Sequence, residues 1–415
     1  MRILRVIASM DPAQGGPCQG IRNSIPALGK LGVYNEVVCL DSPKSNYLHK
    51  DPFTIHAIGP GKTAWCYTPD LIPWLQTNLN RFDAVIVHGL WQYHSYAVTK
   101  VIQDLKQQQA SSSEKRIPKV FVMPHGMLDP YFQKAKERRL KAIRNWFYWK
   151  IIENKVISSA DGVLFTCEAE LELAQQPFRP YKPKQTINIG YGIAEPPVYT
   201  SDMQDAFTAK IPQLEGRPYF LYLGRVHEKK GVDMLIKAYG RILESRSKYV
   251  LADASEAEED FFSAEQVPQL VIAGPGLDTA YGEYLQQLVA ASSELKNSIH
   301  FTGMLTGNAK WGAFHGCEAF ILPSHQENFG ISVVEALACA KAVLISNQVN
   351  IWREIETEQG GIVAANTEEG TQQMLSEWLD LIPQHKRAMG ECARHIFEQY
   401  FAIGPHAKRL LEALS

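Results

Sequence analysis

Two glutamates flank a Phe-Gly step in the stretch SHQENFGISVVEALACAKAV, which spans residues 324–343. The pattern predicts a helix that begins near Gly330, so Glu327 precedes the helix and Glu335 projects from its opening turns, about 80° further round. A carboxylate accepts hydrogen bonds from vicinal hydroxyls, and the helix start offers free N–H groups to an anion. The stretch therefore predicts a site for a ligand with hydroxyl groups and negative charge. The alternative is an exposed loop acid and a helix acid worth roughly a few tenths of a kcal/mol.

A second candidate is the turn GRVHEKKG, residues 224–231, which follows the strand-like run YFLYLG. Open α/β sheets bind ligands at the carboxyl ends of their strands, in front of helix N-termini. There Arg225 can offer a planar fork to two oxygens, while Lys230 acts as a point charge. The two cations suit a diphosphate. For such a motif alone, solvated surface cations are the commoner outcome.

The turn GGP, Gly15 to Pro17, follows the first strand-like run and precedes a helical pattern. Adjacent glycines let the backbone approach a ligand closely, and the helix start favours an anion. The same residues also suit an ordinary tight turn, so this motif alone is a weak signal.

These motifs lie at the ends of strand-like runs that alternate with helical patterns. The first half contains RILRVIAS, EVVCL, AVIVHG, KVFVMPHG and GVLFTC, and a second series begins at PYFLYLGRV, near residue 218. Such alternation predicts parallel sheets with crossover helices. The expected fold class is α/β, with two Rossmann-like doubly wound domains that face each other across a cleft.

The expected domain boundaries follow from a Pro-rich, polar stretch without periodicity, residues 193–218. We expect a first domain over 1–195, a linker over 196–217 and a second domain over 218–398. The last residues, about 399–415, predict a terminal helix, and we expect it to pack back on the first domain.

The composition narrows the class of protein. With 415 residues, of which 45% are hydrophobic, the chain can form two domains of ordinary size. The net charge of -2 gives no general attraction to nucleic acid. The seven cysteines form no C-x-x-C pair, so neither a zinc site nor a disulfide framework is predicted, and a reducing cytoplasm fits best. The N-terminal apolar run is too short for a signal peptide, and no membrane-spanning helix is expected, while attachment to a membrane surface stays open.

Together the three motifs resemble the donor site of the family 4 retaining glycosyltransferases, within the glycosyl transferases group 1, which have the two-domain GT-B fold. The shared patterns are G-R-x4-K-G, here GRVHEKKG, and E-x7-E, here ENFGISVVE, with GGP near the N-terminus. The motifs fall in both halves of the chain, in the family's order. PHGMLDP, residues 124–130, further resembles the subgroup that builds surface polysaccharides and exopolysaccharides.

The resemblance implies a role for each matched residue. Arg225 and Lys230 would bind the diphosphate of a nucleotide-sugar. Glu335 would hold the ribose hydroxyls, Glu327 the hexose hydroxyls, and His125 would approach the sugar from the first domain. The remaining contacts that the resemblance implies are backbone or wall positions: Gly15, Gly16, Gly224, Gly274, Gly276, Gly303, Met304, Asn328, Phe329, Gly330 and Ile331. Asn328 stands where the family often has glycine, which leaves the donor sugar open.

The activity that the resemblance implies is retaining transfer of a hexose from a nucleotide diphosphate sugar to a saccharide or lipid-linked saccharide. UDP-glucose is the first expectation for the donor and GDP-mannose the second. No D-x-D sequence occurs, so no metal or other cofactor is expected, and no residue is assigned as a nucleophile. Two alternatives remain: a nucleotide-sugar epimerase on the same fold, and a non-catalytic nucleotide-sugar sensor.

The acceptor is expected against the first domain. The stretch 132–155 is basic and aromatic and predicts an amphipathic helix, which could lie on an anionic membrane at its inner, cytoplasmic face. A core helix with solvated lysines is the favoured alternative, because Trp and Tyr are more often buried. In HGLWQYH, residues 88–94, Trp91 and His94 are acceptor candidates, although a buried tryptophan would fit equally well.

Overall fold

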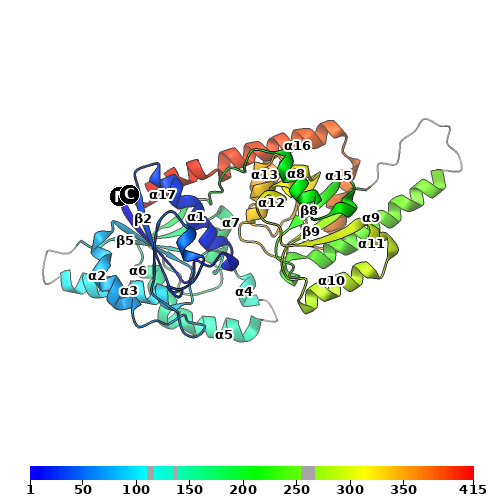
Figure 1. The fold of residues 1–415 in the computed structure, drawn as a ribbon. Coiled ribbons are helices and arrows are strands. Elements are labelled where there is room, and N and C mark those ends of the chain that lie inside the picture. The colour runs from blue at the N-terminus through cyan, green and yellow to red at the C-terminus, as the bar shows by residue number, and fades with distance from the viewer. Residues whose placement is uncertain (110–115, 135–137, 254–266) are drawn as a thin grey trace. The chain divides into compact units, whose positions relative to one another are not determined.

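The computed structural model describes residues 1–109, 116–134, 138–253 and 267–415 of the chain. They form two compact units, one made of Met1–Ala194 with Phe401–Ser415 and the other of Glu195–Tyr400. In the first unit the two ends of the chain lie side by side (Figure 1). The chain therefore leaves its first unit and returns to it at the C-terminus.

Parallel strands form the sheet of the first unit, in the order β3-β2-β1-β4-β5-β6-β7. Buried apolar runs explain strands β1, β2, β4, β5 and β6, because a parallel sheet is covered on both faces, while the edge strands β3 and β7 are partly exposed. The strand order reverses at β1, and this reversal creates a ligand-binding switch point at the carboxyl ends of β1 and β4. The strands span β1 Arg2–Ile7, β2 Tyr34–Cys39, β3 Thr54–Ala57, β4 Ala84–His88, β5 Lys119–Met123, β6 Gly162–Phe165 and β7 Thr186–Asn188.

The helices of the first unit include one departure from regular geometry. A π-helical turn, Trp149–Glu153, lies between α5 and α6, and such turns are rare and frequent at functional sites. The last helix of the chain, α17, packs against α1 within this unit. The helices span α1 Gly16–Gly29, α2 Leu71–Asn78, α3 Tyr93–Gln109, α4 Tyr131–Lys134, α5 Arg139–Tyr148, α6 Asn154–Ser159, α7 Glu168–Ala174 and α17 Ile403–Leu414.

The second unit repeats the plan with a parallel sheet in the order β10-β9-β8-β11-β12-β13. Its strand order reverses between β8 and β11, which places a second switch point at their carboxyl ends. Its strands span β8 Tyr219–Leu223, β9 Gln269–Ala273, β10 Ile299–Gly303, β11 Ala319–Leu322, β12 Val343–Ser346 and β13 Gly361–Ala364. Its helices span α8 Ser201–Thr208, α9 Val232–Asp253, α10 Ala280–Ala290, α11 Ser293–Ser298, α12 Gly307–Gly316, α13 Ile331–Ala338, α14 Trp352–Thr357, α15 Glu368–Asp380 and α16 Pro383–Ile396.

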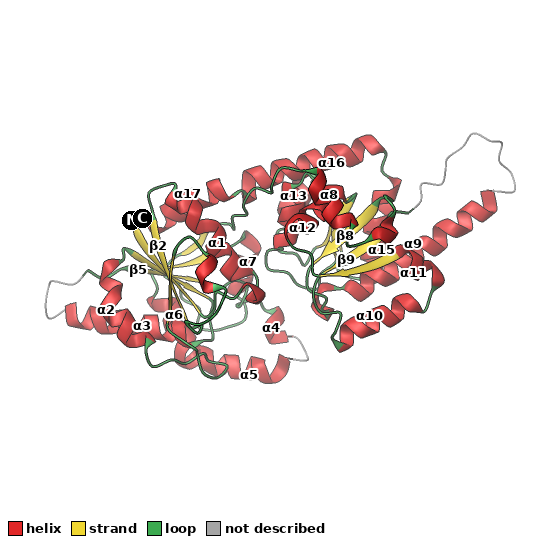
Figure 2. Cartoon of the chain, viewed as in Figure 1, coloured by secondary structure: helices red, strands yellow, loops and turns green. Residues whose placement is uncertain are grey.

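The expected fold class is confirmed, because both units are doubly wound parallel sheets with crossover helices (Figure 2). The stretch expected to be a linker, 196–217, differs from that expectation. It contains α8, which packs closely on α12 in the second unit, where a Cβ on Gly312 would lie 2.0 Å from the carbonyl oxygen of Met203. A short helix flanked by prolines shows too little periodicity to be recognised in the sequence.

Candidate functional site

The turn after β8 and the turn after β11 are joined by two hydrogen bonds in the second unit. The His325 N–H and the Ser324 hydroxyl both donate to the carbonyl oxygen of Lys229, over 2.8 Å and 3.0 Å. Gly231, with φ +66°, permits this approach, since a Cβ there would lie 2.3 Å from the carbonyl oxygen of Pro323. The two motifs singled out in the sequence therefore form one surface at the switch point.

Lys230 and Glu327, one from each turn, form a direct ion pair. The side chains retain only 16% and 20% of their exposure. Burial, with the nearby charges of Lys229 and Arg225, lowers the pKa of Lys230 to about 7, while the carboxylate in contact with its ammonium favours the charged form. The Glu327 backbone is fixed as well, because its N–H donates to Gln348 over 2.9 Å and its carbonyl accepts from Asn350 over 3.0 Å.

Arg225 is exposed at the start of the turn after β8. Three glycines, Gly224, Gly274 and Gly303, lie at the ends of the neighbouring strands. The Arg225 carbonyl oxygen accepts a 2.8 Å hydrogen bond from the Tyr222 hydroxyl. A Cβ on Gly274 would lie 1.8 Å from the Gly224 carbonyl oxygen, and the Gly274 N–H donates to Gly303 over 2.8 Å. The predicted wall glycines thus bring the ends of β8, β9 and β10 together. A Cβ on Gly276, two residues after Gly274, would lie 2.5 Å from the Val226 carbonyl oxygen, and Met304, which directly follows Gly303, is 68% exposed.

Helix α13 begins directly behind the Glu327 turn. Gly330, at φ +81°, occupies the N-cap position, a left-handed conformation that glycine adopts readily. The N–H groups of the first turn, from Ile331 onwards, have no acceptor within the helix and suit an anion. Phe329 is buried and Asn328 is half-buried between this helix start and Glu327. The hydroxyl-binding and anion-binding features predicted for this stretch are adjacent in the second unit.

Glu335 forms an ion pair with Lys310, a residue that the sequence analysis did not identify. Lys310 Nζ lies 2.6 Å from Glu335 Oε1 and 4.8 Å from the centre of the Trp311 ring. Burial raises the pKa of Glu335, and the charge of Lys310 opposes this shift. Lys310 lies in the opening turns of α12, where the helix dipole disfavours a cation. A lysine at such an unfavourable position is a signal in the sequence from which a functional or paired role of Lys310 could have been predicted.

The glycine turn of the first unit leads into α1, as predicted. Gly15 has φ +89° and caps the helix, whose first residue is Gly16. The Tyr191 hydroxyl donates to the Gly16 carbonyl oxygen. A Cβ on Gly20, one turn later, would lie 2.2 Å from that hydroxyl oxygen, so Gly20 is needed for tyrosine to reach the turn.

His125 occupies a constrained turn after β5. Its φ of +53° lies in the left-handed region, and the N–H of the next residue, Gly126, donates to the buried carboxylate of Glu170. His125 Nε2 lies 2.9 Å from His88 Nδ1. Burial, with the charge of Arg5, lowers the pKa of His125 to about 3. His125 is therefore a neutral imidazole at physiological pH.

Trp91 and His94, the two acceptor candidates, differ in accessibility. Trp91 is partly exposed, has φ +70° and donates its N–H to Glu153 Oε1 over 2.7 Å. His94 is fully buried, and its Nε2 lies 2.8 Å from the His88 carbonyl oxygen. Burial lowers the pKa of His94 to about 4. The expected acceptor contact of His94 is therefore corrected, because a neutral side chain enclosed in the core cannot reach an acceptor.

Glu153 and Glu170 are two further buried carboxylates that sequence reasoning missed. Glu153 comes from the π-helical turn and also accepts from the Ser95 hydroxyl over 3.3 Å. Burial raises the pKa of Glu153 to about 7. Glu170 accepts from Thr166 and from the His125 turn. Both hold positive-φ backbone in place, and neither has a sequence motif.

The described parts of the chain contain no group of three or more His, Cys, Asp or Glu residues that could hold a metal ion. Within the same residues, no helix has both the length and the apolar character needed to cross a membrane.

Solved structures share this architecture along the whole chain. Anabaena Alr3699/HepE in complex with UDP superposes with a TM-score of 0.69 and 14% identity, covering 100% of this chain and 99% of that one. Sucrose-phosphate synthase (tll1590) from Thermosynechococcus elongatus gives 0.68 and 16%, covering 100% and 98%. The two Rossmann-like units thus define the GT-B fold.

Residues 203–395 match the model of the family described as Glycosyl transferases group 1. The match covers most of the second unit, Glu195–Tyr400. Among curated proteins, glycogen synthase from Mycobacterium tuberculosis is 24% identical over 234 residues, which is 56% of this chain and 46% of that protein. The uncharacterized glycosyltransferase MJ1607 from Methanocaldococcus jannaschii is 25% identical over 177 residues, 41% and 39% respectively. The similarity thus spans less than half the length of these relatives.

Proposed function

We propose that this chain is a glycosyltransferase that moves a hexose from a nucleotide diphosphate sugar to a saccharide. The observation that carries the proposal is the largely buried Lys230–Glu327 pair beside the start of α13, at the switch point of the unit that matches the glycosyl transferases group 1 model. A cation, a hydroxyl acceptor and free helix N–H groups are the three features that a sugar diphosphate needs. A purely structural ion pair would not require the helix start to lie next to it.

The donor would be bound by the edge of the second unit. Arg225 and Lys230 would contact the diphosphate, and Lys230 would exchange part of its contact with Glu327 for a phosphate oxygen. Glu327 would then accept from hexose hydroxyls, while Glu335 would accept from the ribose. Lys310 supports the last role, because its charge opposes the effect of burial and favours the ionised form of Glu335, which only accepts hydrogen bonds.

The chemistry would rest on stabilising the leaving group. When the bond between the sugar and the diphosphate breaks, negative charge grows on the departing phosphate oxygen. Arg225, Lys230 and the α13 start are worth most at that moment, since they are already in place. We propose a retaining reaction without a dedicated metal, in which the acceptor hydroxyl attacks from the leaving-group face and no protein side chain forms a covalent bond to the sugar.

The donor is proposed to be UDP-glucose, with GDP-mannose second. One structure with the same fold is a complex of HepE with UDP and glucose, whereas a matched curated protein, 29% identical over 132 residues, is a mannosyltransferase, WbdA from Escherichia coli. We further propose family 4 membership and a surface polysaccharide product, which the motif PHGMLDP supports. Asn328 is the residue we expect to contribute to the choice of sugar.

The proposed activity is tested by thermal-shift titration with UDP, GDP, ADP and their sugars, followed by transfer assays with the stabilising donor. Arg225→Ala and Lys230→Ala should each lower transfer by about 10²- to 10³-fold, whereas Lys210→Ala, an exposed lysine of the same unit, should not. Glu327→Gln should lower transfer more than nucleotide binding. An epimer formed without an acceptor would identify an epimerase instead, and donor binding without turnover would identify a sensor.

We also propose that α5 contacts an anionic membrane on the cytoplasmic side. The described part of the stretch 132–155 excludes 135–137, but α5 and the π-helical turn expose an apolar stripe at helical spacing: Leu140, Ile143, Phe147 and Ile151. Exposed basic residues flank it: Arg139, Lys141, Arg144 and Lys150. A stripe of this kind suits lipid tails beside anionic headgroups. The stretch contains the aromatic run Trp146, Phe147, Tyr148 and Trp149. The core-helix alternative holds for Trp149 alone among these four, since it is fully buried and stacks on Phe178.

Vesicle co-sedimentation tests this contact. The natural chain should bind vesicles that contain phosphatidylglycerol at low salt and release them at high salt. Ile143→Ser with Phe147→Ser should abolish binding, whereas Tyr34→Ser, another exposed aromatic of the first unit, should leave it unchanged. If the natural chain stays in the supernatant at low salt, the membrane contact is wrong.

A further inference from the structure

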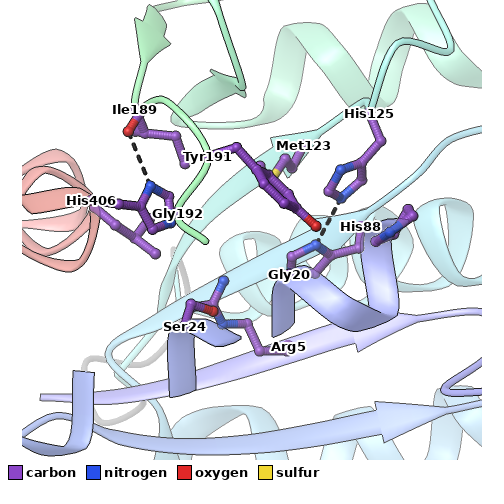
Figure 3. A pocket seen from close by; sticks show the side chains of 12 residues that line it. Arg5, Gly20, Ser24, His88, Met123, His125, Ile189, Tyr191, Gly192 and His406 are labelled. Carbon is purple, nitrogen blue, oxygen red and sulfur yellow. Dashed lines mark hydrogen bonds between the residues drawn. The ribbon is translucent and has the colours of Figure 1, made fainter. Parts of the chain in front are cut away.

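A small cavity lies inside the first unit, enclosed by β1, β4, α1, α17 and the loop after β7 (Figure 3). The space open to the centre of a water-sized particle is about 10 Å³, so the cavity admits one particle that is a little larger than a water molecule. The polar side chains around it are Arg5, Ser24, His88, His125, Tyr191 and His406. A phosphate, a sulfate or a carboxylate-bearing ligand is too large for this space.

Arg5 brings a buried positive charge to the cavity. The residue is 2% exposed, and its Nε donates to Asn35 Oδ1 over 3.2 Å. Its Nη2 has no hydrogen-bond partner among the described residues, and none of their acidic side chains pairs with it. Burial lowers the pKa of Arg5 to about 10, so the guanidinium is still charged at neutral pH. A buried charge is costly without a counter-ion.

The histidines around the cavity do not supply that counter-ion. Burial lowers the pKa of His88 well below its ordinary value, and lowers those of His125 and His406 to about 3 and about 4. The three rings are therefore neutral, and the charge of Arg5 contributes to each shift. His88 is 4% exposed, and its Nε2 has no partner within the described residues.

We infer that the cavity binds a small monoatomic anion of the halide class, chloride in a cell, between Arg5 Nη2 and His88 Nε2. The residues that line the cavity include no Asp or Glu, so an anion entering it meets N–H donors and one uncompensated positive charge. A water molecule has the right size but leaves the charge of Arg5 unbalanced. The anion site is separate from the donor edge of the second unit, and it stands whether or not the chain transfers sugars.

The bound anion would also select a tautomer of His125. If His88 donates its Nε2–H to the anion, the Nδ1 of this neutral ring carries no proton and must accept a hydrogen bond. His125 Nε2, 2.9 Å away, is then the donor, so His125 Nδ1 is left as an acceptor. The anion therefore fixes which nitrogen of His125 can accept a proton or a hydroxyl hydrogen bond.

Thermal unfolding in sodium chloride, sodium bromide and sodium gluconate at equal ionic strength tests the site, because gluconate is too large to enter. A ligand that binds only the folded state raises the Tm with its concentration, so each tenfold rise in halide above its Kd should raise the Tm by about 3 to 5 °C. Gluconate should give no such rise. Equal melting curves in the three salts would overturn the proposal.

Two further measurements locate the effect. Arg5→Met should remove the halide-dependent shift, whereas Arg2→Met, which changes an exposed arginine of the same strand, should keep it. A halide shift that survives Arg5→Met would place the anion elsewhere and contradict the assignment. If Arg5→Met does not fold, anomalous diffraction from crystals of the natural chain grown in bromide decides the matter: a peak beside Arg5 Nη2 supports the site, and its absence refutes it.

Discussion

Two regions of the molecule treat their buried ionisable groups in opposite ways: the surroundings of His125 and Trp91 in the first unit, and the sheet edge of the second unit. In the first unit, Arg5 and Glu153 are buried without an oppositely charged partner among the described residues, and the histidines beside them are held neutral by burial. In the second unit, Glu327 and Glu335 are each paired with a lysine at the sheet edge. This part of the first unit thus holds uncharged or uncompensated groups in fixed positions, whereas the sheet edge of the second unit holds opposite charges in contact. Elsewhere in the first unit, the buried Glu36 is paired with Arg2 and Arg81, so the contrast is between two sites and not between all the charges of the two units.

This difference separates two kinds of site. A paired charge can change partners when a ligand arrives, because the ligand replaces one attraction with another, so the second unit suits a ligand that binds and leaves. A neutral, enclosed hydrogen-bond network resists change, since any proton gained inside it must be desolvated. The first unit therefore suits the positioning of His125 and of the Trp91 loop rather than the neutralisation of ligand charge.

The largest expected effect of this contrast is that the first unit loses more stability than the second at acidic pH. His94, His125 and His406 have folded pKa values of about 4, about 3 and about 4, against an unfolded value of about 6.5. Their depressed pKa values mean that the unfolded state binds more protons below about pH 6.5, so stability falls as the pH drops. By pH 5 the loss should reach about 2 kcal/mol for each histidine.

Hydrogen–deuterium exchange at pH 7 and pH 5 measures this effect separately in each unit. Amides of β1, β4 and β5 should lose protection, while those of β8, β11 and β12 should keep more of theirs. His300 and His315 of the second unit also have lowered pKa values, but both are partly exposed and solvent reduces the penalty. Equal loss of protection in the two units would show that the contrast in buried histidines does not govern acid stability.

A smaller effect is expected from separating a pair in the second unit. Lys310→Met leaves the buried carboxylate of Glu335 without its partner and should cost about 3 kcal/mol of unfolding free energy at pH 7. The double variant Lys310→Met with Glu335→Gln removes the charge as well and should recover most of that loss. Urea unfolding of the two variants gives the comparison. If the double variant is no more stable than Lys310→Met, the unpaired charge of Glu335 is not what destabilises the single variant.

The sequence was sufficient for the parts of the molecule whose residues are close in the chain. GRVHEKKG and ENFGISVVE each occupy a strand end, a turn and a helix start, so local pattern and helix geometry predict where Arg225, Glu327 and Gly330 lie. Lys310 was missed because its partner lies 25 residues away in another helix. Contacts of this kind depend on which strands are neighbours, and a single sequence does not contain that information.

The first unit shows the same limit more strongly. Glu153 reaches the backbone of Trp91 across 62 residues, and it does so from a π-helical turn that helical periodicity does not predict. The sequence predicts an acceptor contact for His94 because it lies in the stretch HGLWQYH together with Trp91, yet His94 occupies the buried face of α3. Burial of a polar side chain depends on a partner elsewhere, here the His88 carbonyl oxygen.

The smallest expected effect tests whether the uncompensated charge of the first unit is a cost to its stability. Burial raises the pKa of Glu153 to about 7 from an ordinary value of about 4.3, so the folded state keeps a proton that the unfolded state loses. Stability should therefore fall as the pH rises from about 4.3 through 7. Glu153→Gln keeps an oxygen for the Trp91 N–H and cannot ionise, so at pH 8 it should be about 1 to 2 kcal/mol more stable than the natural chain, and at pH 5 it should not be. The gain is less than the full pKa shift implies, because the new amide N–H₂ takes the place of Glu153 Oε2, which has no partner among the described residues.

Glu170→Gln is the matched control, since Glu170 already accepts from Gly126 and Thr166 and its replacement should destabilise the fold at both pH values. A Glu153→Gln variant that is less stable than the natural chain at pH 8 would mean that the charge of Glu153 strengthens the Trp91 contact, and that this region of the first unit, like the sheet edge of the second, uses an ionised carboxylate.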